Sequence, residues 1–304
     1  MKIRQDVAVF INDDSRTDAV DALLRARRTA VPAVAICAGA VLGRLGDRRK
    51  GVGLTKQGVP DIDWIEIPAG NFTMGSREED SQWGDERPQF NCKLITEPYR
   101  LSRYPVTVAQ YQAFVDAHGY EHAKWWTQAQ AAGCWQDGKV KSRYWTESKW
   151  DEEWREAPGD SGEPFRCLNH PVVDINWFEA VAFCHWLAEQ LKMKVTLPSE
   201  AEWERAARHT NGRVYPWDNS TKDVAQRCNM SATGIGHTSA VGMFPSGHAE
   251  CGAADMAGNV WEWTRSLWGK DGVTPDFGYP YTLDDDRENL DAPNDTLRVL
   301  RGGS

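Results

Sequence analysis

The feature that most constrains this chain is the combination of many tryptophans with many residues that interrupt regular backbone. Its 304 residues include 15 Trp, 26 Gly and 15 Pro. A buried tryptophan ring fills a large volume and needs a partner for its indole N–H, whereas Gly and Pro punctuate helices and strands. We therefore expect a loop-rich fold in which large aromatic rings pin irregular backbone.

Charge and cysteine content exclude several classes of function. The formal net charge is −9, and no basic stripe of the kind that neutralises phosphates is present. We therefore expect neither nucleic acid nor a membrane as a partner. The cysteines form no CxxC pair and number seven, which argues against a disulfide framework and against a zinc site. Reduced thiols of this kind are typical of a cytoplasmic protein.

The first 55 residues differ in character from the rest. Apolar residues recur at helical spacing around Val20 and Leu24, and the apolar run 30–43 is followed by the glycine-containing GDRRKGVG. This pattern predicts two short helices and a linker. The run is shorter than the roughly 20 residues of a membrane span. The stretch from the end of this run into the linker is similar to the end of a helical repeat of the HEAT type. A single repeat of this kind must pack against another part of the protein to bury its apolar face. We assign 1–55 to a helical N-terminal segment and linker, and 56–304 to the main domain.

Three helix starts in the main domain carry the capping-box pattern, in which Ser, Thr or Asn precedes Glu or Gln by three residues. The pairs are Thr107 with Gln110, Asn176 with Glu179, and Ser199 with Glu202. Upstream, Ile65 and Ile67 alternate with polar neighbours as in a half-buried strand. The chain therefore reads as α+β, with helices packed on short strands.

Two long segments show no helix or strand period. Residues 121–168 hold six tryptophans among Lys, Glu and Asp, and we interpret them as a long, ordered excursion pinned by its aromatic rings. Residues 270–296 are acidic and rich in turn residues, which is typical of a surface loop. The acidic run 284–286 within it is interpreted as solvated, with a weak cation site as the alternative.

Seven sequence blocks identify a family. They are IPAGNFTMGS, YPVTVAQYQAF, HPVVDINWFEAVAFCHWL, VTLPSEAEWERAAR, YPWD, DMAGNVWEWT and RVLRGGS. In this order they resemble the formylglycine-generating enzyme, or sulfatase-modifying factor, superfamily. The resemblance implies a C-type-lectin-like fold with few regular elements. It does not fix the function, because the superfamily holds copper-dependent oxidases that make formylglycine, iron enzymes that join sulfur to histidine derivatives, and variable proteins of diversity-generating retroelements.

The resemblance places no catalytic residue inside this chain. In the oxidases, two cysteines a few residues beyond RGGS bind copper, since thiolates select Cu(I). This chain ends at Ser304, and Cys184 matches a family cysteine with a structural role. The iron enzymes use histidines of an added helical domain, and residues 1–55 hold no His. We expect the domain to be C-terminally incomplete, not to be an enzyme as it stands, and to bind copper only if a cysteine pair follows Ser304.

The block DMAGNVWEW holds the best candidate metal ligands. The resemblance implies a structural Ca²⁺ bound by Asp255, the carbonyl of Ala257, Asn259 and Glu262. Hard oxygen donors at short spacing on a glycine-containing turn suit this ion. The alternative is that Asp255 and Glu262 cap turns and pair with an arginine.

A second family calcium site would use Asn229 and the carbonyl of Met230. The following GIGHTSAVG has no acid at the expected downstream position, which counts against this site. The other residues near the blocks are assigned structural roles: Trp261 and Trp263 in the core, Arg301 in an inward ion pair, and His170 as a hydrogen-bonded imidazole.

Two functions follow from these observations. The first is a binding or display scaffold that resembles a retroelement variable protein and recognises a protein or small-molecule ligand. The large loops, the acidic character and the missing cysteine pair favour it. The alternative is a copper-dependent oxidoreductase of the formylglycine-generating type, or a related iron oxidoreductase, without its C-terminal catalytic segment. The alternation in 298–301 predicts a terminal strand, whose exposed edge is expected to mediate a dimer.

Overall fold

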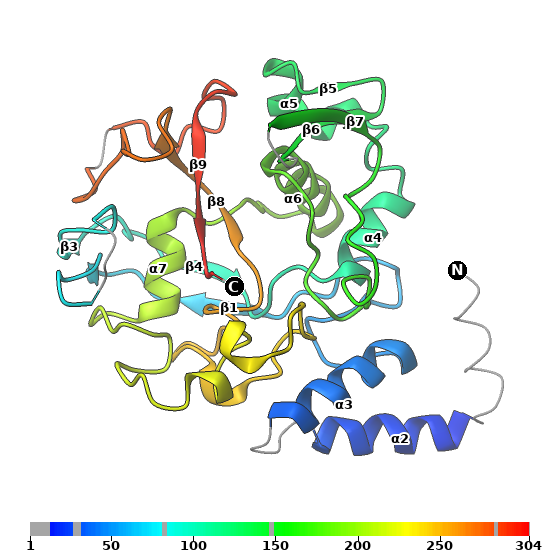
Figure 1. The fold of residues 1–304 in the computed structure, drawn as a ribbon. Coiled ribbons are helices and arrows are strands. Elements are labelled where there is room, and N and C mark those ends of the chain that lie inside the picture. The colour runs from blue at the N-terminus through cyan, green and yellow to red at the C-terminus, as the bar shows by residue number, and fades with distance from the viewer. Residues whose placement is uncertain (1–12, 27–31, 81–83, 146–148, 283–284, 304) are drawn as a thin grey trace.

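The structure, a computed structural model, describes residues 13–26, 32–80, 84–145, 149–282 and 285–303. Helices and short strands are separated by long irregular stretches, as Figure 1 shows. Within the described residues the strands pair into four small antiparallel sheets instead of one large sheet. This is the loop-rich α+β architecture that the sequence predicts.

Two helices, α2 (Asp13–Ala26) and α3 (Pro32–Leu45), pack together at the N-terminal end. The second helix lies against the main domain, where Ile36 packs beside Met243. A Cβ at Gly39 would lie 2.6 Å from the Sδ of Met243, so only glycine allows this approach. The two predicted helices and their contact with the main domain are confirmed. No described helix is long and apolar enough to cross a membrane.

Hydrogen bonds reinforce the attachment of α3 and its linker. The Nδ2 of Asn169 donates to the carbonyl of Gly39 and to Oδ2 of Asp47, each over 2.9 Å. Asp47 forms a buried ion pair with Arg49, whose guanidinium also donates to the carbonyl of Val241. These bonds join the linker to the irregular stretch that contains Val241.

The three main-domain helices are α4 (Val108–Asp116), α6 (Trp177–Leu191) and α7 (Glu200–Arg208). Each begins with the predicted capping box, with both reciprocal hydrogen bonds present. At α6 the amide of Glu179 donates to Oδ1 of Asn176 over 3.0 Å, and the amide of Asn176 donates to Oε2 of Glu179 over 2.7 Å. The predicted helix starts are therefore confirmed.

Short strands complete the main domain. The antiparallel pairs are β1 (Trp64–Ile67) with β4 (Tyr99–Ser102), β2 (Phe72–Met74) with β3 (Phe90–Cys92), and β8 (Glu262–Gly269) with β9 (Leu297–Arg301). The buried Ile65 and Ile67 confirm the predicted first strand. The predicted strand at the C-terminal end is confirmed as β9. The connecting turns include the 3₁₀ helices η2 (Val224–Gln226), η3 (Ser231–Thr233) and η4 (Pro245–Gly247).

The largest apolar cluster lies between α4 and α6 and is dominated by aromatic rings. The rings of Tyr111 and Phe183 stack with centroids 5.3 Å apart, and Phe114 meets Phe183 edge-on. The indole N–H of Trp126 donates to the carbonyl of Gly119 over 2.9 Å. A buried ring thus fixes the irregular backbone that follows α4, as the tryptophan content predicts.

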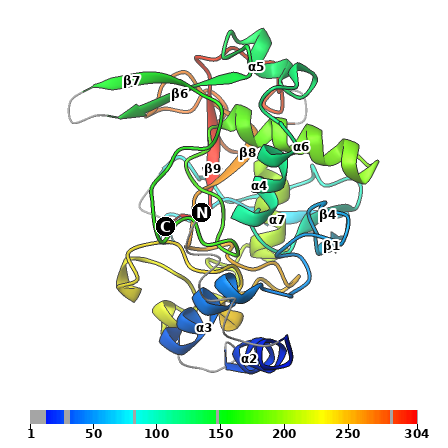
Figure 2. The same cartoon turned by 90° about the vertical axis from the view of Figure 1, so that its right-hand side faces the viewer.

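The excursion 121–168 is more regular than the sequence suggests. It contains η1 (Ala123–Trp125), α5 (Thr127–Ala131), and a three-stranded sheet of β5 (Trp135–Gln136), β6 (Lys139–Trp145) and β7 (Trp150–Arg155). The hairpin of β6 and β7 projects from the body, as Figure 2 shows. The segment is ordered, as predicted, but the sequence did not show its strands because charged residues dominate the projecting hairpin and cross-strand charges contribute to its pairing.

The loop 270–296 contains no helix or strand in its described part, as predicted. Asp284 lies outside the described residues. Asp286 is exposed, whereas Asp285 forms an ion pair of 2.5 Å with the buried Arg287. The prediction of a fully solvated acidic run is therefore wrong for Asp285, which helps to anchor the loop.

Candidate functional site

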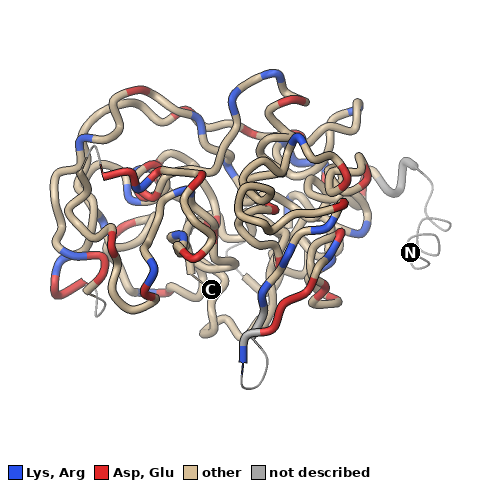
Figure 3. Tube along the Cα trace, turned by 90° about the horizontal axis from the view of Figure 1, so that it is seen from above, with Lys and Arg blue, Asp and Glu red and all other residues tan. Residues whose placement is uncertain are grey.

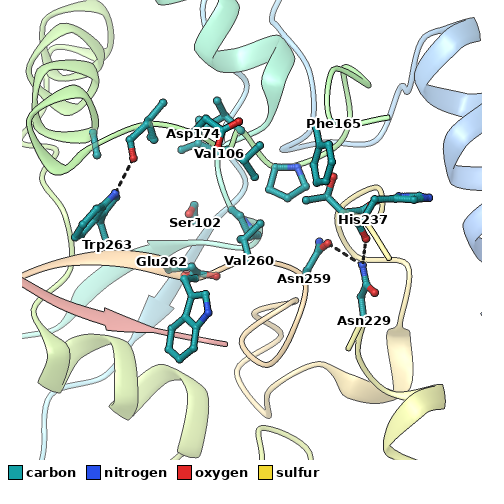
Figure 4. Close-up of a pocket in the computed structure, with 18 of the residues that line it drawn as sticks. Ser102, Val106, Phe165, Asp174, Asn229, His237, Asn259, Val260, Glu262 and Trp263 are labelled. Atoms are coloured by element: carbon teal, nitrogen blue, oxygen red, sulfur yellow. Dashed lines mark hydrogen bonds between the residues drawn. The ribbon is translucent and has the colours of Figure 1, made fainter. Parts of the chain in front are cut away.

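A cavity of about 710 Å³ opens beside the start of β8. Figure 4 shows Glu262 and Trp263 on one side of it, and Asn229 and His237 on the other. The apolar part of its wall comes from several distant segments and includes Val106, Phe165, Val172, Leu197, Met230 and Val260. The wall therefore brings together the family blocks that surround α4, α6, α7 and β8.

The two tryptophans on this wall differ in environment. Trp263 is half-buried and its Nε1 donates to the carbonyl of Ile175 over 3.1 Å. Trp261 is 58% exposed, so our prediction of a core position is wrong. It precedes the first residue of β8, where the backbone turns its ring to the cavity rim instead of into the interior.

The turn 255–259 positions the predicted metal ligands. Asp255 and Asn259 adopt positive φ angles of 60° and 70°, an uncommon conformation that Asp and Asn tolerate better than most residues. Asp255 Oδ2 accepts the amide of Gly242 over 2.7 Å. Asn259 Oδ1 accepts the amide of Ser239 over 2.8 Å, and its Nδ2 donates to the carbonyl of Ser239 over 3.2 Å. The Asn259 side chain is thus engaged within the protein.

Glu262 carries an unsatisfied buried oxygen. Its Oε2 accepts the indole N–H of Trp203 over 2.9 Å, whereas its Oε1 is buried without a partner among the described residues. Burial raises the pKa of Glu262 to about 7, and the nearby Asp255 carboxylate raises it further. Burial also raises the pKa of Asp255 to about 6, although the Gly242 amide and the Arg49 charge oppose this rise. The pKa of Glu262 is therefore sensitive to the charge of Asp255.

This geometry fits a cation in part. A cation bound by Asp255 and Glu262 would lower the cost of burying their charges and would satisfy the orphaned Oε1. Neither carboxylate forms an ion pair with an arginine in the described part of the chain. No group of three or more His, Cys, Asp or Glu there is arranged to hold a metal. Calcium would consequently need backbone carbonyls, such as that of Ala257, to complete its oxygen shell.

The second candidate pair has its oxygens engaged elsewhere. Asn229 donates to the carbonyl of His237 over 2.8 Å, and its Oδ1 accepts the hydroxyl of Thr233 over 3.3 Å. The same hydroxyl donates to the carbonyl of Met230 over 2.6 Å. These bonds fix the cavity wall, and the absence of a downstream acid still counts against a second calcium ion.

Arg301 pairs inward, as predicted. Its NH2 lies 3.0 Å from Oε2 of Glu204 and its NH1 3.4 Å from Oε1 of Glu200, and it also pairs with Glu86. The Arg301 charge holds the pKa of Glu86 below its ordinary value, whereas burial raises the pKa of Glu200 to about 7 despite Arg301. Arg208 binds the other oxygen of Glu204 over 2.8 Å. The network fastens β9 to α7.

His170 is a satisfied structural histidine, as predicted. It is buried, with Nδ1 3.0 Å from the hydroxyl of Thr238. Burial lowers its pKa to about 4, and His237 adds to the effect. The neutral ring therefore has a structural role beside Thr238, which lines the cavity.

The cysteines are poorly suited to thiolate chemistry. All seven are free thiols, and none of them lines the cavity. Burial raises the pKa of six of them, to about 12 for Cys184 and about 11 for Cys228. The buried Cys184 agrees with its predicted structural role.

Sequence reasoning missed the cavity itself. Its apolar wall combines Val106, the stretch 171–175 and Leu197, which are far apart in the chain. The only local signal is the position of YPV and HPVV next to helix starts, where an isolated β-bridge joins Thr107 to Pro171. Such a cavity is visible only once the helices are packed.

The small antiparallel sheets, the capped helices and the central cavity define a C-type-lectin-like α+β domain. Residues 54–304 match the sulfatase-modifying factor enzyme 1-like domain family. The chain therefore belongs to the formylglycine-generating enzyme (sulfatase-modifying factor) family, as the sequence blocks predict.

Similar proteins agree with this assignment. A formylglycine-generating enzyme of Thermomonospora curvata is 32% identical over 268 residues, which cover 79% of this chain and 81% of that protein. A hercynine oxygenase of Mycolicibacterium thermoresistibile is 31% identical over 245 residues, which cover 77% of this chain but only 50% of that protein. The solved structure of PvdO from Pseudomonas aeruginosa covers 84% of this chain and is covered to 87%, with a TM-score of 0.56 and 22% identity. That likeness supports the fold alone.

Proposed function

We propose that this chain is a ligand-binding domain of its family, with the cavity beside β8 as the binding site. One observation carries the proposal: the cavity of about 710 Å³ is open and walled largely by apolar side chains. Pockets of roughly 300–1,000 Å³ with apolar walls and a few polar groups are typical of ligand sites. The exposed Trp261 at the rim offers a large amphipathic surface to a small molecule or to a side chain of a protein ligand.

The second candidate function is that of an oxidoreductase, because the similar proteins include a formylglycine-generating enzyme and a hercynine oxygenase. Copper chemistry of the formylglycine-generating type needs thiolates, and the raised pKa values of Cys184 and Cys228 keep those thiols protonated at neutral pH. The described cysteines therefore favour binding over redox catalysis. The free state of all seven thiols agrees with a cytoplasmic location for this binding domain.

A structural calcium ion forms part of the proposal. Bound between Asp255 and Glu262, it would neutralise two carboxylates whose repulsion is otherwise unopposed by an ion pair. Because Glu262 begins β8 and lines the cavity, the ion would fix one wall of the binding site. It would take no part in chemistry on the ligand.

The neutral apolar dye N-phenyl-1-naphthylamine tests the binding site. We expect saturable binding to the native chain, measured by dye fluorescence and by shifts of the Trp261 indole signal in ¹H–¹⁵N spectra. Val106→Trp fills the cavity and should weaken dye binding about tenfold, which corresponds to about 1.4 kcal/mol. Val273→Trp is the control, since Val273 is 85% exposed on a distant loop. Equal dye affinity in both variants, or no shift at Trp261, would refute the proposed site.

A further inference from the structure

The hairpin of β6 and β7, together with the turn that follows it, forms a projecting arm, defined here as residues 139–143 and 151–160. Figure 3 shows basic residues along one strand and acidic residues along the other. The basic strand β6 carries Lys139, Lys141 and Arg143, and the acidic strand β7 carries Asp151, Glu152 and Glu153. Such segregation of charge on a projecting hairpin differs from the mixed surface elsewhere on the molecule.

The base of the arm is rigidly held. Val140 is fully buried and lies opposite Arg155 in the strand register. The Arg155 guanidinium pairs with the buried Glu179 and donates to the carbonyl of Asp174 over 2.7 Å. Because the one cation of β7 is turned inward, the other charged side chains of this strand are all carboxylates.

Internal ion pairs neutralise only some of these carboxylates. Lys141 Nζ lies 2.7 Å from Glu152, and Arg143 Nε lies 3.7 Å from the same group. Glu153 and Glu156 are exposed and have no hydrogen bond or ion pair in the described part of the chain. Two carboxylates without an ion pair therefore remain along and just beyond β7, although Glu153 interacts electrostatically with Arg155.

The acidic strand also has a free edge. β7 pairs with β6 alone among the described strands, so its outer backbone groups have no strand to bond. Trp154 is 44% exposed on this strand. A hollow of about 380 Å³ beside it is lined by Trp154, Glu153, Glu156, Pro158 and Asp160, with Lys139 at the opposite strand. Backbone donors, an aromatic face and carboxylates thus meet at one edge.

We propose that β7 binds an extended lysine- or arginine-containing segment of a partner protein as an added strand. Main-chain hydrogen bonds to a free edge supply affinity in this mode, and alternate side chains supply specificity. The cations of the segment pair with Glu153 and Glu156. The arm is separate from the cavity beside β8, so this interaction is additional to the proposed ligand site.

Charge complementarity favours such a partner over a second copy of this chain. Symmetric pairing of β7 with β7 of another copy would set carboxylates opposite carboxylates, which is destabilising. Pairing of the acidic edge with the basic strand of another copy is a head-to-tail contact. Such a contact adds further copies in an open chain instead of forming a closed dimer. A cationic extended segment satisfies the edge without either penalty.

The test uses fluorescein-labelled (Lys-Val)₄ as the probe, with (Glu-Val)₄ as its charge-reversed counterpart. Fluorescence anisotropy should show saturable, salt-sensitive binding of (Lys-Val)₄ and no binding of (Glu-Val)₄. The double variant Glu153→Gln, Glu156→Gln should bind (Lys-Val)₄ about tenfold more weakly, whereas the matched control Glu97→Gln, an exposed carboxylate on another loop, should bind it normally.

A second probe separates strand addition from simple charge attraction. (Lys-Val)₄ methylated on the backbone nitrogens of its valines keeps its charge but loses donors along one edge, and it should lose most of its affinity. Equal binding of the methylated and unmethylated peptides would overturn strand addition. Equal binding by the double variant and the native chain, failure of (Lys-Val)₄ to bind, or concentration-dependent self-association through the arm would also refute the proposal.

Discussion

Replacing Arg301 by methionine tests whether the buried ion network holds β9 in place. The change removes every donor from Arg301 but keeps an apolar side chain of similar length. Glu204 is fully buried and keeps Arg208, whereas Glu86 and Glu200 lose the cation that they share. Removing one partner of a buried ion pair typically destabilises a protein by about 3–5 kcal/mol, because a buried charge is left uncompensated. We expect a loss in this range at pH 8.

The loss of unfolding free energy caused by Arg301→Met should be smaller at pH 5 than at pH 8. The direction of this pH dependence follows from the carboxyl groups that Arg301 contacts. Without Arg301, the folded-state pKa values of Glu86 and Glu200 rise above those of the unfolded chain. The folded variant therefore retains protons that the unfolded chain releases, and its stability falls as pH rises through this window. Urea unfolding of the native chain, Arg301→Met and the control Arg77→Met, whose exposed ion pair should not matter, measures the differences. A loss below about 1 kcal/mol at pH 8, or an equal loss at pH 5, would refute this reasoning.

Three further predictions concern the turn and the thiols. If Asp255 and Glu262 bind calcium, a chelator should lower the melting temperature, since an ion bound only by the native state stabilises it by mass action. Glu262→Gln should abolish this response to the chelator. Identical melting temperatures with and without chelator would contradict calcium binding. Gly258→Ala should destabilise the chain by at least about 2 kcal/mol more than Gly234→Ala in urea titrations. A Cβ at Gly258 would overlap the carbonyl of Asn229, whereas Gly234 faces open space. Equal losses of unfolding free energy in the two variants would show that the turn can relax. Purified chain with Cu(I) and oxygen should produce no aldehyde from a CxPxR peptide by mass spectrometry, because no cysteine pair is placed to bind the metal. Conversion that disappears on substitution of any of the seven cysteines would overturn the binding role.

Local patterns predicted the parts of the fold that local physics controls. The caps at Thr107, Asn176 and Ser199 form as expected because each box involves residues only three apart. The ordered sequence blocks also predicted the family and its fold. These signals do not depend on how distant segments pack.

Features that depend on tertiary packing were missed or misassigned. Trp261 was placed in the core because its type is usually buried, yet its position before β8 leaves it at the cavity rim. The strands β6 and β7 were missed because charged residues dominate them and only a few positions, such as Val140 and Ser142, are buried. The hydrogen bonds of Asn259 to Ser239 were also missed, because they cross a loop that the sequence does not place. Each error reflects a long-range partner.

The bonds around Asn169 link the N-terminal helices to the candidate cation site. From Gly39 the path runs through Asn169 and Asp47 to Arg49, then to the carbonyl of Val241. The next residue, Gly242, donates its amide to Asp255. These bonds make α3, the linker and Asp255 parts of one continuous network, so direct contacts connect the packing of the N-terminal helices to the turn that holds the candidate cation ligands.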